Sequence, residues 1–84
     1  SNVNREELLL ALEKAPFKER LFCWRLLARE ILNDTNLIDR AIADSAPEVR
    51  QWAASHLPND EKFKNRLDTL FSDSAIRVRY AALK

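Results

Sequence analysis

Residues 44–54 read DSAPEVRQWAA, and residues 73–83 read DSAIRVRYAAL. The second stretch follows the first after 29 residues, and six of the eleven positions are identical: Asp, Ser, Ala, Val, Arg and the later Ala. The segments before them keep the same spacing, since IDRAI at 38–42 aligns with LDTLF at 67–71. A fixed period of this length is typical of stacked structural repeats, each covering the apolar face of its neighbour.

The rest of the chain divides into six segments with helical patterning. The turn-forming stretches between them are Pro16 and residues 33–36, 45–47, 58–60 and 72–74. In the fourth segment, apolar residues and His56 recur at i, i+3, i+4, i+7 and i+8 from Val49, which predicts one buried helix face. The second helix is predicted from about Phe17 to Leu32. We expect Pro47 in the first turn of the fourth helix, and Asn59 or Asp60 as the cap of the fifth.

A weaker third copy precedes these two repeats. WRLLA at 24–28 lies over VRQWA at 49–53, which keeps an apolar residue, then Arg, then Ala three positions later. No segment alternates as a strand does. The predicted fold is therefore all-α, a right-handed α-solenoid of about three stacked antiparallel helix pairs. It forms one domain over residues 1–84, with a degenerate repeat at about 5–32 and repeats at about 35–57 and 60–84.

The pattern Asp-Ser-Ala-x-x-Val-Arg-x-x-Ala resembles the HEAT and HEAT-like repeats, including the short kind found in phycobilisome lyases. The resemblance covers about residues 35–84, whereas residues 5–32 depart from it, with Glu19 in the place of the Asp. It implies that the conserved-type Asp and Arg link neighbouring repeats through hydrogen bonds. The structural links carried over in this way are Asp44, Arg50, Asp73, Arg79 and Arg25.

Several residues allow a second interpretation. Arg50 and Arg79 could bind an anionic partner, but their recurrence with the repeat favours a structural link, because a guanidinium fork holds a carboxylate in one geometry. Trp24 and Trp52 lie on apolar stripes, so core packing is preferred over a role as interface anchors. His56 is interpreted as a boundary residue, and Cys23 as an inert buried thiol.

Charge is uneven along the chain. The net charge is +1, with −2 in residues 1–60 and +3 in residues 61–84. A possible binding surface for nucleic acid therefore consists of Lys62, Lys64, Arg66, Arg77 and Lys84. The alternative is a solvated face whose charge Glu61 and Asp68 relieve.

Composition excludes several kinds of site. The chain has no glycine, so dinucleotide fingerprints and phosphate loops are excluded. One cysteine and one histidine cannot build a four-ligand zinc site of the usual kind. We expect no catalytic residue, no metal, no cofactor and no enzyme activity. The longest apolar run, residues 8–12, is too short to span a bilayer, and the single cysteine fits a cytoplasmic protein.

These observations predict a function by architecture. Stacked helix pairs offer a rigid surface, so we predict a non-enzymatic scaffold or adaptor module that binds another protein. The alternatives are a nucleic-acid-binding module that uses the basic C-terminal third, and an accessory subunit resembling the bilin lyases. Val78, Ala81, Ala82 and Leu83 are expected at or near an uncovered end. The chain is therefore expected to be part of a longer array or to self-associate through that end.

Overall fold

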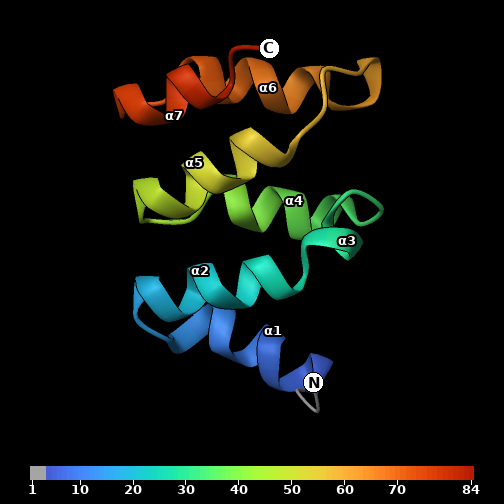
Figure 1. The fold of residues 1–84 in the computed structure, drawn as a ribbon, viewed down its shortest axis with the longest axis vertical. Coiled ribbons are helices and arrows are strands. Elements are labelled where there is room, and N and C mark those ends of the chain that lie inside the picture. The colour runs from blue at the N-terminus through green and yellow to red at the C-terminus, as the bar shows by residue number, and fades with distance from the viewer. Residues whose placement is uncertain (1–3) are drawn as a thin grey trace.

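The computed structural model describes residues 4–84, and every regular element among them is helical (Figure 1). The elements are α1 (Arg5–Lys14), α2 (Phe17–Leu26), α3 (Ala28–Ile31), α4 (Thr35–Ile42), α5 (Pro47–His56), the 3₁₀ turn η1 (Glu61–Phe63), α6 (Lys64–Phe71) and α7 (Ile76–Ala81). The predicted all-α fold class is confirmed for the described part of the chain.

The helices form three successive layers along the long axis of the molecule (Figure 1). α1 packs on α2, α4 on α5, and α6 on α7, while α3 joins the first layer to the second. The second helices of the layers are neighbours in turn, because α2 packs on α5 and α5 packs most extensively on α7. The chain thus progresses from one end of the molecule to the other, and the two termini lie far apart.

Aspartate side chains close the turns of a chain that has no glycine. No residue from 4 to 84 has a positive φ. Instead, the carboxylates of Asp34, Asp44, Asp60 and Asp73 each accept a hydrogen bond from the N–H two residues later. Such a turn satisfies a free backbone donor at the start of a helix without left-handed backbone. The expected cap at Asp60 and the expected position of Pro47 in the first turn of α5 are both confirmed.

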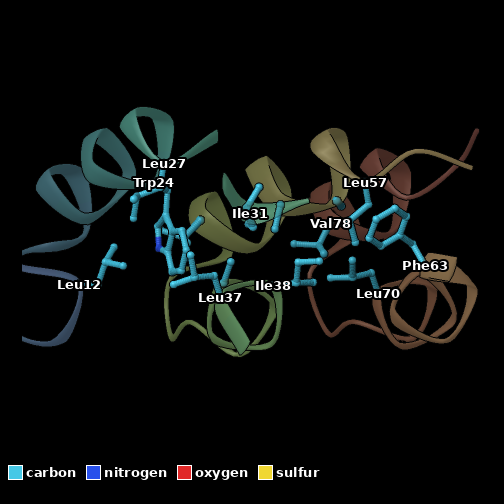
Figure 2. Packing of buried hydrophobic residues seen from close by; sticks show 14 of the residues in the cluster. Leu12, Trp24, Leu27, Ile31, Leu37, Ile38, Leu57, Phe63, Leu70 and Val78 are labelled. Atoms are coloured by element: carbon cyan, nitrogen blue, oxygen red, sulfur yellow. The ribbon is translucent and has the colours of Figure 1, made fainter. Parts of the chain in front are cut away.

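One hydrophobic core runs through all three layers (Figure 2). Trp24 and Leu27 lie where the first layer meets the second, Ile38 lies between the second and the third, and Leu70 and Val78 belong to the third. All five side chains are almost fully buried. The stabilising burial of apolar surface therefore arises as much between layers as within them.

The predicted second helix, from about Phe17 to Leu32, is interrupted. α2 ends at Leu26, Leu27 has φ −95° and ψ 7°, and α3 begins at Ala28. The residues around the break are good helix formers, so sequence propensity gives no sign of it. Packing explains the break, because Leu27 and Ile31 are both buried, on either side of it, in the core shared with the second layer.

Shortening Ile38 tests the shared core. Ile38→Ala is expected to lower the free energy of unfolding by about 2–5 kcal/mol, because it leaves a cavity between the second and third layers. Leu10→Ala is the matched control, since Leu10 is exposed on α1 and its loss should change stability by less than about 0.5 kcal/mol. Urea unfolding followed by circular dichroism measures both; equal effects would contradict a continuous core.

Candidate interaction surfaces

A hydrogen-bonded arginine links the second layer to the third. Arg50 donates from Nε to Asp73 Oδ2 at 2.8 Å and from Nη2 to Asp73 Oδ1 at 3.1 Å. Its Nη1 donates to the backbone carbonyl of Asp44 at 2.7 Å, which fixes the guanidinium against its own layer. The side chains of Arg50 and Asp73 are only 15% and 11% exposed. A bidentate, largely buried pair of this kind fixes the distance and orientation of two layers.

The same link joins the first layer to the second, but Arg20 makes it and Arg25 does not. Arg20 donates to Asp44 Oδ2 at 3.0 Å and Oδ1 at 2.9 Å, and its Nη1 donates to the carbonyl of Ala15 at 2.7 Å. Arg25 is exposed. The predicted alignment of the weak copy was therefore wrong, because the turn before α2 is one residue shorter, and Ala15, rather than Glu19, takes the place of the Asp.

Arg79 repeats only half of this arrangement. Its Nη1 donates to the backbone carbonyl of Asp73 at 2.7 Å, the distance found for Arg20 and Arg50. Within residues 4–84, no carboxylate pairs with the rest of its guanidinium. The side chain is thus held in the linking position with its Nε–Nη2 edge open.

Charge pairing shifts the protonation equilibria of the linked groups. The hydrogen bonds from Arg50 hold the pKa of Asp73 below its ordinary value, helped by the N–H of Ala75 and opposed by partial burial. The hydrogen bonds to Asp44 and Asp73 raise the pKa values of Arg20 and Arg50. Both links therefore keep their charges at neutral pH.

A second, more exposed link lies on the first helices of the layers. Arg66 of α6 donates to both carboxylate oxygens of Asp39 on α4, at 2.9 and 3.3 Å. The residue 29 positions after Asp39 is Asp68, which is exposed and has no hydrogen-bond or ion-pair partner among residues 4–84. Asp68 therefore stands to the third layer as Asp39 stands to the second.

Most of the basic residues predicted as a possible binding surface are engaged by the preceding layer. Arg66 pairs with Asp39, and Arg77 pairs with Glu48 at 3.3 Å. Lys62 donates to the carbonyl of Leu32, and Lys84 to the carbonyls of Ala54 and Ser55. Lys64 is the one member with no such bond in the described part of the chain. These residues contribute contacts between layers, and they do not form one free basic patch.

The exposed large apolar side chains gather on the two outer layers. The first layer carries Leu10, Phe22 and Leu26, and the third carries Phe71, Ile76, Tyr80 and Leu83. The second layer, between them, has none. In a stacked structure the central layer is covered on both sides and the outer layers on one, so these two ends are the surfaces on which further apolar burial is available.

The aromatic residues and the cysteine take different positions. Trp24 is almost fully buried, whereas Trp52 is partly buried and stacks on exposed His56 with 4.3 Å between ring centres. With Leu21 and Arg25, they line a shallow hollow between α2 and α5. Cys23 is buried, and burial raises the pKa of its thiol, which disfavours the reactive thiolate.

Neither a metal cluster nor a membrane-spanning element is found in residues 4–84. No three His, Cys, Asp or Glu side chains converge there, and no helix has the length and apolar character to cross a bilayer. Comparison of the chain with protein-family models, curated proteins and solved structures finds no match. The function of these surfaces therefore has to be argued from their geometry.

The link between Arg50 and Asp73 makes stability depend on pH. Asp73→Asn keeps the shape but removes the charge, and is expected to lower the free energy of unfolding at pH 7 by about 1–3 kcal/mol. Because the folded-state pKa of Asp73 is depressed, its contribution is complete above the unfolded pKa of about 3.9 and is lost as pH falls below it. Urea midpoints of the two proteins should therefore converge between pH 5 and strongly acidic solution.

Asp68→Asn is the matched control for this measurement. It removes a carboxylate from the same layer, but one that is exposed and unpaired in residues 4–84. It should leave the urea midpoint unchanged at pH 7. A gap between the wild type and Asp73→Asn that is the same at pH 3 and pH 7 would contradict a charged link.

Proposed function

We propose that the protein is a short α-solenoid of three HEAT-like helix pairs that acts as a non-enzymatic interaction module for other proteins. The recurrent arginine links support the solenoid, since Arg20 and Arg50 make the same three hydrogen bonds between successive layers. The packing of α2 on α5 and of α5 on α7 supports the same arrangement.

The observation that carries the proposed function is the placement of exposed apolar side chains. All seven large ones lie on the outer layers, and Phe22 and Tyr80 are 59% and 68% exposed. Aromatic side chains supply much of the binding energy at protein interfaces, where they are buried in the centre of the contact. Two apolar ends on a rigid stack thus suit a module that is contacted at its ends by other helical proteins.

The alternative function, nucleic-acid binding, has less support. Phosphate neutralisation needs Lys and Arg side chains free to face the backbone of the nucleic acid. Arg66 and Arg77 already face carboxylates, and Lys62 and Lys84 face backbone carbonyls. The basic excess of residues 61–84 is in this way used largely between layers.

Replacing the apolar ends tests the proposal. Immobilised wild type is compared with Phe22→Ser/Leu26→Ser and with Ile76→Ser/Tyr80→Ser in capture from a lysate of the source cells. A bound protein should be retained by the wild type and lost from at least one double variant, by about tenfold or more, because interface aromatics carry over 1.4 kcal/mol each. Asn36→Ser/Ser55→Ala, two exposed positions on the central layer, is the matched control and should bind as the wild type does.

Fluorescence anisotropy with labelled duplex and single-stranded DNA decides the alternative. The expected result is no binding at micromolar protein, even at low salt. Affinity that falls steeply with salt and is abolished by Lys62→Glu/Lys64→Glu would overturn the proposed function in favour of nucleic acid.

A further inference from the structure

The C-terminal end face consists of Ile76, Arg79, Tyr80 and Leu83. One helical turn after each linking arginine stand Trp24, Ala54 and Leu83. The first two are 1% and 0% exposed, because the following layer covers them, whereas Leu83 is 62% exposed. Ile76, Tyr80 and Leu83 follow each other at i, i+4 and i+7, so they lie along one side of α7. This side corresponds to the one that α5 buries against α7.

Two charged groups of opposite sign accompany this apolar side. Arg79 presents its open Nε–Nη2 edge, already held by the carbonyl of Asp73. Asp68, on the first helix of the same layer, presents a carboxylate beside a hollow of about 350 Å³ that Leu67, Phe71 and Ala82 also line. At the preceding junction, the same two positions are Arg50, which receives Asp73, and Asp39, which receives Arg66.

We propose that the C-terminal end face, together with Asp68, binds a helix pair of a partner protein that carries an arginine on its first helix and an aspartate seven residues later, in the connecting turn. The arginine pairs with Asp68 and the aspartate with Arg79. Arg66 and Asp73 have this spacing in the third layer, so the chain itself shows the arrangement that its end accepts. Apolar residues of the partner cover Ile76, Tyr80 and Leu83. The inference rests on the proposed function and names the chemistry of one of its partners.

A second copy of this chain does not have that chemistry. In the first layer, the positions that correspond to Arg66 and Asp73 are Leu8 and Ala15. Stacking the N-terminal end of one copy on the C-terminal end of another would therefore leave both Asp68 and Arg79 without an opposite charge. Leu8 is also buried in the core, so its side chain is not available to a neighbour.

A lengthened chain presents the required helix pair to the intact protein. Lys84 stands 29 residues after Ser55, so a second copy of residues 56–84 joined directly after Lys84 continues the repeat. The copy brings its own Arg66 and Asp73 to the end face. Hydrogen exchange of the Leu83 amide and urea unfolding are then measured in the 84-residue chain and in the lengthened chain.

We expect the appended helix pair to fold on the end face. The Leu83 amide should exchange at least about tenfold more slowly than in the 84-residue chain, because the segment becomes covered. Arg79→Gln should increase the unfolding equilibrium constant about tenfold more in the lengthened chain than in the 84-residue chain. Asp68→Asn should act in the same direction but more weakly, because the corresponding pair of Arg66 and Asp39 is more exposed.

Arg77→Gln is the matched control, because Arg77 pairs with Glu48 inside the existing structure and should act equally in both chains. Unchanged Leu83 exchange, an appended pair that stays unfolded, or an equal effect of Arg79→Gln in both chains would each overturn the inference. So would a concentration-dependent dimer of the 84-residue chain, seen by analytical ultracentrifugation and abolished by Arg79→Gln.

The two proposals fail separately in these experiments. The capture experiment tests whether the apolar ends bind a protein of the cell, and the lengthened chain tests which charges the C-terminal end accepts. Loss of a captured protein from Phe22→Ser/Leu26→Ser, together with an appended pair that does not dock, would leave the proposed function intact and remove only the inference.

Discussion

The arginine that reaches from one layer to the aspartate of the next is the interaction on which the rest of the structure depends. Each linking guanidinium is fixed twice, by a carbonyl of its own layer and by a carboxylate of the following one. The aspartate is also used twice, since its carboxylate closes the turn that starts the next helix. Helix initiation and layer stacking thus rely on the same side chain, which couples local structure to overall arrangement.

This double use explains how a chain without glycine makes sharp turns. A helix usually ends or restarts with help from a residue that tolerates left-handed backbone. Here the Asp carboxylate bonds the N–H of Ala46 or Ala75, and the backbone keeps negative φ throughout residues 4–84. The small alanine after the turn is buried or half-buried, so the following helix starts close to the core. The arginine then holds the turn in place from the neighbouring layer.

The sequence predicts the second and third layers well because both copies of the Asp-to-Arg segment have the same length. The all-helical class, the Asp60 cap and the position of Pro47 could all be predicted from local chemistry. The first layer was misaligned, because a turn shortened by one residue moves the linking arginine from the expected Arg25 to Arg20. A single deletion in a short turn leaves the helical pattern unchanged, so periodicity alone does not reveal it.

The surfaces were harder to predict than the links. A run of basic residues at 61–84 suggests a free cationic patch, but the structure gives four of the five candidate side chains partners in the preceding layer. Sequence spacing shows which residues share a helix face, yet it does not show which neighbour that face meets.

The same reasoning gives the ends of the molecule their meaning. A linking group is recognised by its partner inside the stack, and at the last layer the same group is identified by the bonds that it keeps. Arg79 retains the bond to its own layer and has lost only the forward carboxylate, so its orientation does not depend on an occupant. A side chain already held in its binding geometry loses less conformational entropy when a partner arrives. Apolar surface beside it then adds affinity, while the charges decide which helix pair fits.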